Sequence, residues 1–115
     1  MAAPFLETAM SNLSQESIEL KGVDSLFALY EIAMGYSGQC QVVASFLAGL
    51  YNGSDYPFDL TELRVIDDAI FEHCMNVLRM DTRLCKQEVH QYFEHGSEKF
   101  QTMIGRWKLE QACRS

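Results

Sequence analysis

The residues best suited to chemistry in this 115-residue chain are its cysteines and histidines. Cys85, His90 and His95 follow one another at five-residue intervals, and Cys74 lies in the predicted helix before them. Structural zinc sites usually contain tight cysteine pairs separated by two to four residues, and the chain has no such pair. Steps of five residues along a helix also turn successive side chains about 140° away from a common face. The spacing therefore predicts no metal site and no bound cofactor.

Catalytic motifs are missing as well. The chain has no G-x-S-x-G, no phosphate-binding glycine loop and no H-E-x-x-H. Asp68 and Glu72 form a like-charged pair four residues apart, which acid–base sites use but which surface helices carry too. A cysteine nucleophile paired with histidine is conceivable at Cys74 or Cys85, but no spacing singles out either one. We predict no catalytic residue and no enzyme activity. A small enzyme or metal protein that uses Cys74, Cys85 or His90 is the alternative.

The charge is strongly uneven along the chain. The sequence has 9 Lys and Arg against 16 Asp and Glu, a net charge of −7. Residues 1–62 hold eight acids and Lys21 alone, whereas residues 63–115 hold eight acids and eight bases. This distribution disfavours direct binding of nucleic acid or of an anionic membrane. An acidic surface can instead bind a basic protein or imitate the phosphates of DNA, and it can also simply keep a small protein in solution.

The candidate partner-binding surface is the local cluster of acids that only Arg64 opposes. It consists of Asp55, Asp59, Glu62, Asp68 and Glu72. The start of the chain lacks a basic stretch followed by an apolar one, and no eighteen consecutive residues are apolar, so we expect neither a signal peptide nor a membrane span. Without a signal, the four cysteines are expected to be free thiols in the cytoplasm.

The elements that must position these residues are helices. Apolar residues recur at helical spacing and alternating strand patterns are missing, which predicts an all-α, compact, single-domain bundle. Residues 1–22 are predicted to form a flexible or loosely docked arm, and 23–115 the helical domain. We expect about five helices, near 24–34, 38–51, 60–79, 83–94 and 98–112.

Local signals set the expected ends of these helices. Ser37 or Gly38 should start the second helix, and Asp59 with Glu62 resembles a capping box at the start of the third. A break is expected at Met80–Thr82, while Gly96 should close one helix before Ser97 caps the next. The residues predicted to be mostly buried are Phe27, Tyr30, Phe46, Leu47, Leu63, Ile70, Val77, Phe93, Phe100, Ile104 and Trp107.

One stretch resembles a known group of proteins. The pattern comprises Gly38-Gln39, Val43 to Leu47, Tyr51-Asn52, Phe58 to Leu63, and Asp67. It is similar to a small uncharacterised proteobacterial domain family, across about residues 26–80. Members of that family are often found on plasmids and integrated elements. The family has no established activity, so the resemblance implies a context and no mechanism.

These observations together predict a non-catalytic, protein-binding protein of a bacterial mobile element. Its concrete form is an acidic inhibitor of a host defence or nucleic-acid-binding complex, either anti-CRISPR-like or a DNA mimic. A basic nucleic-acid-binding protein is the expected partner, because the acidic first half of the chain would occupy a cationic channel. A structural homodimer, built on apolar surface along the last helix, is a further alternative.

Overall fold

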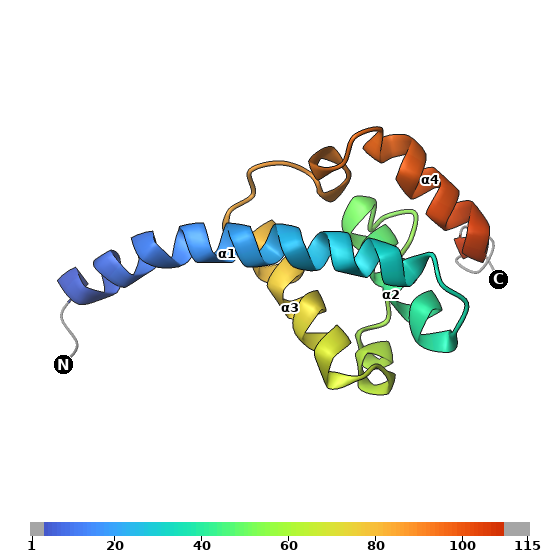
Figure 1. The fold of residues 1–115 in the computed structure, drawn as a ribbon, viewed down its shortest axis with the longest axis horizontal. Coiled ribbons are helices and arrows are strands. Elements are labelled where there is room, and N and C mark those ends of the chain that lie inside the picture. The colour runs from blue at the N-terminus through green and yellow to red at the C-terminus, as the bar shows by residue number, and fades with distance from the viewer. Residues whose placement is uncertain (1–3, 110–115) are drawn as a thin grey trace.

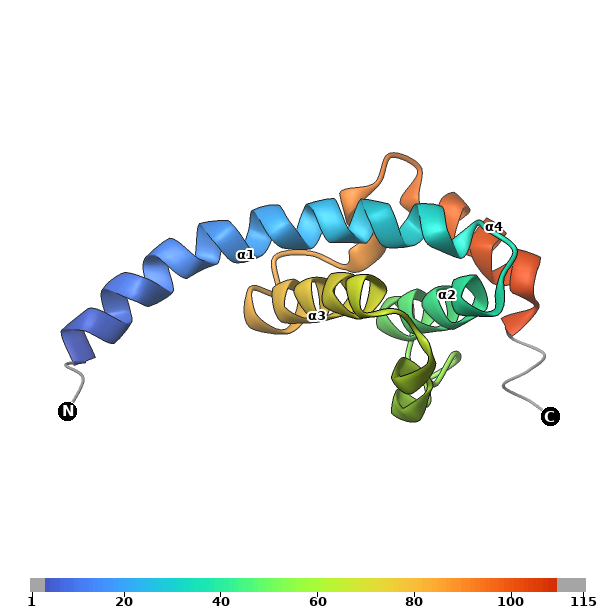
Figure 2. The same cartoon turned by 60° about the horizontal axis from the view of Figure 1, so that its bottom comes forward.

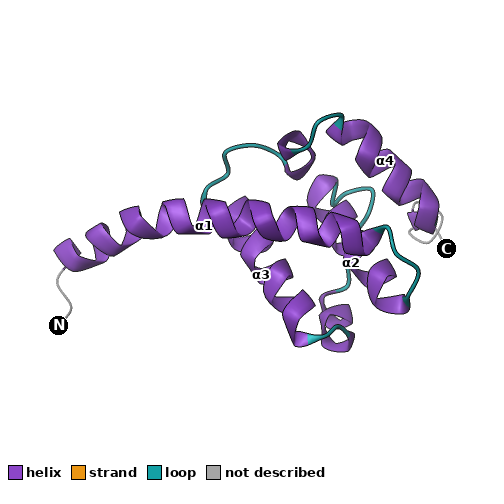
Figure 3. Cartoon of the chain, in the orientation of Figure 1, coloured by secondary structure: helices purple, strands orange, loops and turns teal. Residues whose placement is uncertain are grey.

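The fold consists of helices joined by short turns and loops. The computed structural model describes residues 4–109, with side chains from residue 15 onward, and no strand occurs in that part of the chain. The α-helices are α1 (Pro4–Ala33), α2 (Gly38–Tyr51), α3 (Asp68–Arg83) and α4 (Gly96–Trp107) (Figure 1). Two short 3₁₀ helices, η1 (Leu60–Val65) and η2 (Val89–Tyr92), complete the set. Helices connected by loops account for the whole described chain (Figure 3), which confirms the all-α prediction.

Helix α1 is the element on which the others assemble. It runs along one side of the body, with α2 and α3 packed against it, and its N-terminal part extends beyond the other helices (Figure 2). The turn after α1 reverses the chain into α2, where the Ser37 side chain accepts a hydrogen bond from the backbone N–H of Cys40 (3.3 Å). Ser37 is therefore the N-cap of α2, which decides between the two starts, Ser37 and Gly38, that the sequence allows.

Helix α4 is tied to the end of α1 by two side-chain hydrogen bonds. The indole N–H of Trp107 donates to the Ala33 carbonyl oxygen (2.7 Å), and Arg106 donates to the Gly35 carbonyl oxygen (2.9 Å). The last carbonyl groups of a helix have no partner within it. The Trp107 bond satisfies the last carbonyl group of α1, the Arg106 bond satisfies one in the turn that follows, and together they fix α4 against the α1–α2 turn.

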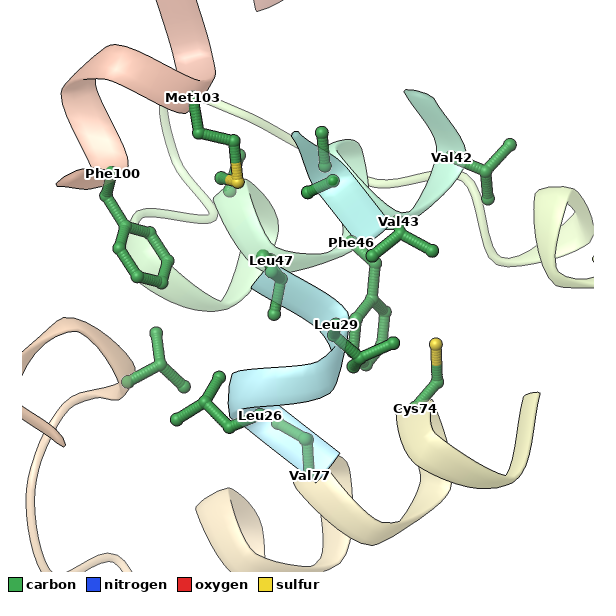
Figure 4. Close-up of a cluster of buried hydrophobic side chains, with 14 of the residues drawn as sticks. Leu26, Leu29, Val42, Val43, Phe46, Leu47, Cys74, Val77, Phe100 and Met103 are labelled. Carbon is green, nitrogen blue, oxygen red and sulfur yellow. The ribbon is translucent and has the colours of Figure 1, made fainter. Parts of the chain in front are cut away.

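The core lies where α1, α2, α3 and α4 meet. Figure 4 shows Leu26 and Leu29 of α1 close to Leu47 of α2 and Val77 of α3. The largest fully buried side chains are Phe100, Leu26, Leu29, Leu47, Met80, Met103, Ile104, Val43, Val77, Val89 and Cys74. Because α4 buries Phe100, Met103 and Ile104 in this core, those residues are not free to form the homodimer surface expected along the last helix.

The contact between α1 and α3 is unusually close. A Cβ atom at Gly22 would lie 2.5 Å from both Cβ and Sδ of Met80, so only glycine fits at this position without a shift. Met80 is fully buried against α1. The helix break predicted at Met80–Thr82 is therefore wrong, because α3 continues through these residues to Arg83 and packs Met80 into the core.

Four of the five predicted helices have different limits. The first begins at Pro4 and not near residue 24, because no glycine or proline interrupts residues 5–21. The helix expected over 60–79 is divided into η1 and α3, and the one expected over 83–94 is mostly loop, with η2 inside it. The last helix begins at Gly96 rather than at residue 98, and the end predicted for it at residue 112 lies outside the described residues.

The buried set also differs in part from the prediction. Phe46, Leu47, Val77, Phe100 and Ile104 are buried as expected. The predicted residues that are only half-buried are Tyr30, Leu63, Ile70, Phe93 and Trp107. Phe27 was predicted to be buried, but it is 43% exposed and packs on Phe93, with ring centroids 5.0 Å apart. Apolar residues occur on more than one side of α1, so periodicity alone does not reveal which side faces the core.

Gly96 has a structural role that differs from the predicted one. It is the first residue of α4 and is buried, while His95 before it has the left-handed conformation (φ 56°). A Cβ atom at Gly96 would overlap the backbone carbonyl oxygen of His90. Gly105, in the middle of α4, has nothing within 4 Å of such an atom and is an exposed, tolerated glycine.

Replacing these two glycines should therefore have opposite effects. We expect Gly96→Ala to lower the free energy of unfolding by at least about 2 kcal/mol, because the backbone at His90 must move. Gly105→Ala is the matched control and should raise it by up to about 1 kcal/mol, because alanine is the better helix former. Urea denaturation followed by circular dichroism measures both. Equal stability of the two variants would contradict the close contact between Gly96 and His90.

Truncation of two phenylalanines should separate the core from its periphery. Phe100→Ala should cost about 3–5 kcal/mol, because Phe100 is fully buried. Phe27→Ala should cost only about 1 kcal/mol, because its main ring contact is the pair with Phe93. Thermal unfolding of both variants gives the comparison, and an equal loss in the two would place Phe27 in the core after all.

Candidate functional site

The five predicted site acids occupy two elements and the loop before them. Asp55 lies in the loop that leaves α2, Asp59 and Glu62 lie at the start of η1, and Asp68 and Glu72 lie in the first part of α3. The loop and η1 project from the body on the side of α2 and α3 away from α1 (Figure 2). Glu62 is half-buried and the other four acids are exposed.

Asp59 begins η1. Its carboxylate accepts hydrogen bonds from the Thr61 backbone N–H (2.9 Å) and the Thr61 hydroxyl (2.7 Å). These bonds stabilise the charged form and hold the pKa of Asp59 below its ordinary value. The predicted capping role of Asp59 is confirmed, and its carboxylate carries a negative charge at neutral pH.

Asp55 is held near the end of α2 by Asn52. The Asn52 side chain accepts from the Asp55 backbone N–H (3.2 Å) and donates to the Asp55 carboxylate (3.0 Å). This reciprocal pair shapes the start of the loop. Asp55 therefore has a structural partner, and its carboxylate remains on the surface.

A link between Gln39 and Asp67 explains why η1 and α3 are separate elements. The Gln39 side chain accepts from the Asp67 backbone N–H (2.7 Å) and donates to the Asp67 carboxylate (3.3 Å). Ile66 and Asp67 are both extended, and Ile66 is buried. The link joins the start of α2 to the start of α3 and interrupts the helix that local sequence favours.

Asp59 and Glu62 line one depression of about 520 Å³, which we call the acidic hollow. Its remaining lining residues are Gln41, Val42, Ser45, Tyr56, Pro57 and Leu109. The hollow thus combines two carboxylates with neutral polar groups and apolar surface, and no lysine or arginine is among these residues. Such a combination suits a cationic side chain with an aliphatic stem.

A second depression, the apolar hollow, lies on the other side of Pro57, which lines both. Its volume is about 200 Å³. Its lining residues are Phe46, Gly49, Leu50, Gly53, Pro57, Phe58, Leu60, Leu63 and Leu78. Leu60 is 70% exposed at its edge. The segment around Pro57 therefore separates a negatively charged hollow from an apolar one.

Sequence reasoning identified part of this site. Asp59 and Glu62 come together as predicted, whereas Asp68 and Glu72 line neither hollow and lie on the exposed surface of α3. Gln41, Ser45 and Tyr56 were not predicted. Their place in the hollow depends on how the 53–59 loop folds back onto α2, where a Cβ atom at Gly49 would lie 3.1 Å from Cβ of Phe58. No local pattern encodes that contact.

A comparison with known protein families assigns the chain to a family. The sequence pattern described as a family of unknown function, DUF7673, matches residues 23–108. The chain belongs to this family. The match is consistent with the resemblance to an uncharacterised family over residues 26–80, and it also covers η2 and α4 up to residue 108. No curated protein and no solved structure matches the chain.

The cysteines and histidines of this DUF7673 domain do not assemble into a metal site in the described residues. Cys74 is buried, and burial raises the pKa of its thiol to about 12. Cys85 is exposed and donates to the Asp81 carbonyl oxygen (3.2 Å), while the His90 ring packs edge-on against Tyr51 at 5.0 Å. Cys113 lies outside the described residues. No helix in the described part of the domain is long and apolar enough to cross a membrane.

Ser25, His73 and Asn76 form a polar chain between α1 and α3. Ser25 Oγ lies 2.8 Å from His73 Nδ1 and accepts a hydrogen bond from the Asn76 side chain (3.0 Å). A serine next to a histidine is the beginning of a nucleophilic site. Ser25, however, is only 2% exposed, so its hydroxyl is closed to a substrate and serves the contact between the helices.

Cys40 is the thiol with a depressed pKa. Partial burial by itself would raise that pKa, but the Ser37 hydroxyl, backbone N–H groups of the turn and the nearby Arg106 outweigh it, so the pKa of Cys40 is below its ordinary value. The Ser37 hydroxyl donates to Cys40 Sγ at 3.2 Å. Sequence reasoning considered Cys74 and Cys85 for thiol chemistry and did not select Cys40.

The three described thiols should react at different rates. In a Cys113→Ser background, iodoacetamide should leave Cys74 unmodified in the native state, since its thiol is buried and protonated. The thiolate is the nucleophile, so the midpoint of the pH–rate profile of Cys40 should lie below that of a free cysteine peptide. Ser37→Ala removes a donor and should raise that midpoint. A Cys40 midpoint at or above the peptide value would contradict the thiolate stabilisation.

Proposed function

We propose that this DUF7673 domain is a non-catalytic interaction protein that binds a basic, amphipathic segment of a partner protein. The observation that carries the proposal is the acidic hollow, where Asp59 and Glu62 line a depression and no lysine or arginine is among the described lining residues. Asp55, Asp68 and Glu72 line neither hollow, but they add exposed negative charge on the loop after α2 and on α3.

The two hollows suit two neighbouring side chains of one segment. An arginine or lysine can place its aliphatic stem on Val42 and Pro57 and its charged head beside Asp59 and Glu62. An apolar side chain on the same segment can enter the apolar hollow across Pro57. Exposed ion pairs contribute only about 0–1 kcal/mol each, so the acids supply association rate and selectivity, and apolar burial supplies most of the affinity.

The combination of carboxylates and apolar surface favours a partner that itself binds nucleic acid. Such proteins carry cationic surfaces that a domain of net charge −7 can occupy in place of phosphates. The specific form we propose is a cytoplasmic inhibitor, encoded on a bacterial mobile element, of a host defence or nucleic-acid-binding complex. The mobile-element context comes from the family resemblance, and the acidic surface supports the choice of partner.

Neutralising the acidic surface tests the proposal. The test variant carries Asp55→Asn, Asp59→Asn, Glu62→Gln, Asp68→Asn and Glu72→Gln; asparagine keeps the capping ability at position 59. Its matched control neutralises five exposed acids elsewhere: Glu16, Asp24, Glu31, Glu94 and Glu98. Both variants change the net charge from −7 to −2. Differences between them therefore reflect where the charges lie and not how many there are.

Tagged wild type and both variants are purified from the native host at low and high salt, with mass spectrometry of bound proteins. We expect wild type and control to capture the same basic nucleic-acid-binding protein, and the test variant to lose it. High salt should weaken the capture, because mobile ions screen exposed charges. Retention of every partner by the test variant would refute the proposed surface.

A further inference from the structure

A third depression, with the opposite charge, lies between α1 and α3. Its volume is about 210 Å³, and its lining residues are Ser17, Ile18, Lys21, Asn76 and Arg79. Helices α1 and α3, which carry these residues, lie side by side (Figure 2), and Gly22 and Met80 follow Lys21 and Arg79 directly in the chain. We call it the cationic hollow, because two bases and no acid are among its described lining residues.

The two bases are unpaired within the described side chains. Neither Lys21 nor Arg79 forms an ion pair or a hydrogen bond there, whereas Lys86, by contrast, pairs with Glu19 at 2.8 Å. Two cations that share a small hollow repel each other unless an anion lies between them. This arrangement is unexpected in a chain with 16 acids and 9 bases, where Lys21 is the only base before residue 64. Within the described residues, no acid forms an ion pair with either base of the cationic hollow.

Neutral donors complete the lining. The Ser17 hydroxyl and the Asn76 amide add hydrogen-bonding groups to the ammonium and guanidinium groups. Asn76 is held in place by its bond to Ser25, which in turn contacts His73, and Ser25 is 2% exposed. The bond to Ser25 therefore fixes one of the four polar residues, Asn76, and the other three lie on α1 and α3. Such preorganisation lowers the cost of ordering the site when a ligand binds.

We propose that the cationic hollow binds a phosphoryl group. A phosphate monoester carries a charge of about −1.5 to −2 at neutral pH, which matches one lysine and one arginine, and its three oxygens can accept from all four donors. A carboxylate carries half that charge. The volume is below the roughly 300–1,000 Å³ of sites that bury drug-sized ligands, so the hollow takes the anionic group and leaves the rest of its carrier outside.

This site is independent of the proposed partner surface. None of the five acids of that surface lines the cationic hollow, and no lining residue of the cationic hollow lines the acidic hollow. Loss of one function by substitution should leave the other intact, so each proposal can fail alone.

Titration of ¹⁵N-labelled protein by NMR tests the phosphoryl site. The probes are inorganic phosphate and N-acetyl-O-phosphoserine amide, each at constant ionic strength, with acetate as the comparison anion. We expect saturable shifts of the amides at residues 17–22 of α1 and 76–80 of α3. Lys21→Gln/Arg79→Gln should weaken binding at least about tenfold, because both charges are lost. Arg64→Gln/Lys108→Gln removes two exposed cations elsewhere and should leave the affinity unchanged.

Two results would overturn the proposal. The first is a linear, non-saturating response to both phosphoryl probes; the second is equal affinity in the wild type and the folded Lys21→Gln/Arg79→Gln variant, as judged by its circular dichroism. Acetate binding as tightly as phosphate would also exclude selectivity for a phosphoryl group. The relative affinities of the two phosphoryl probes identify the source of the phosphoryl group. Tighter binding of the phosphoserine amide indicates a phosphorylated side chain, and tighter binding of inorganic phosphate indicates a free ion.

Discussion

The packing of α3 and α2 against one face of α1 is the contact on which the rest of the structure depends. It requires a glycine at position 22, since Met80 occupies the space that any side chain there would need. Leu26 and Leu29 follow on the same face and are fully buried. Because interiors are packed as densely as organic crystals, a change at this contact spreads to the neighbouring elements. It holds α3 in place, and with it both the buried polar chain and the cationic hollow.

Charge is separated on the surface that this packing creates. The acidic hollow is formed by α2, η1 and the loop between them, whereas the cationic hollow is formed by α1 and α3. Neither hollow is built from one element alone, so a partner or an anion that binds at either would also favour the folded state by mass action. The family match over residues 23–108 includes every described lining residue of the acidic hollow except Leu109.

Local signals in the sequence predicted the fold class, a helix start at Ser37 or Gly38 and the cap at Asp59, because each depends on residues a few positions apart. Contacts between distant residues account for the failures. The division of the third predicted helix depends on Gln39 and Asp67, 28 positions apart. Tyr56 joins the acidic hollow through the fold of its loop, and Arg79 meets Lys21 only because α3 packs on α1. Phe27 shows the same limit, because apolar residues occur on more than one side of α1 and their spacing does not reveal which side is buried.

The Gly22–Met80 contact also defines where this domain is chemically vulnerable. A thioether at the tightest point between two helices is harmless while it is apolar and shielded from solvent. Conversion of Met80 to its sulfoxide, during a transient opening of the helices, would add a polar oxygen where a Cβ atom cannot be accommodated. The two helices could then pack together again only at a larger separation. A single oxidised sulfur atom would thereby separate Lys21 from Arg79, and a sulfoxide reductase would restore the contact.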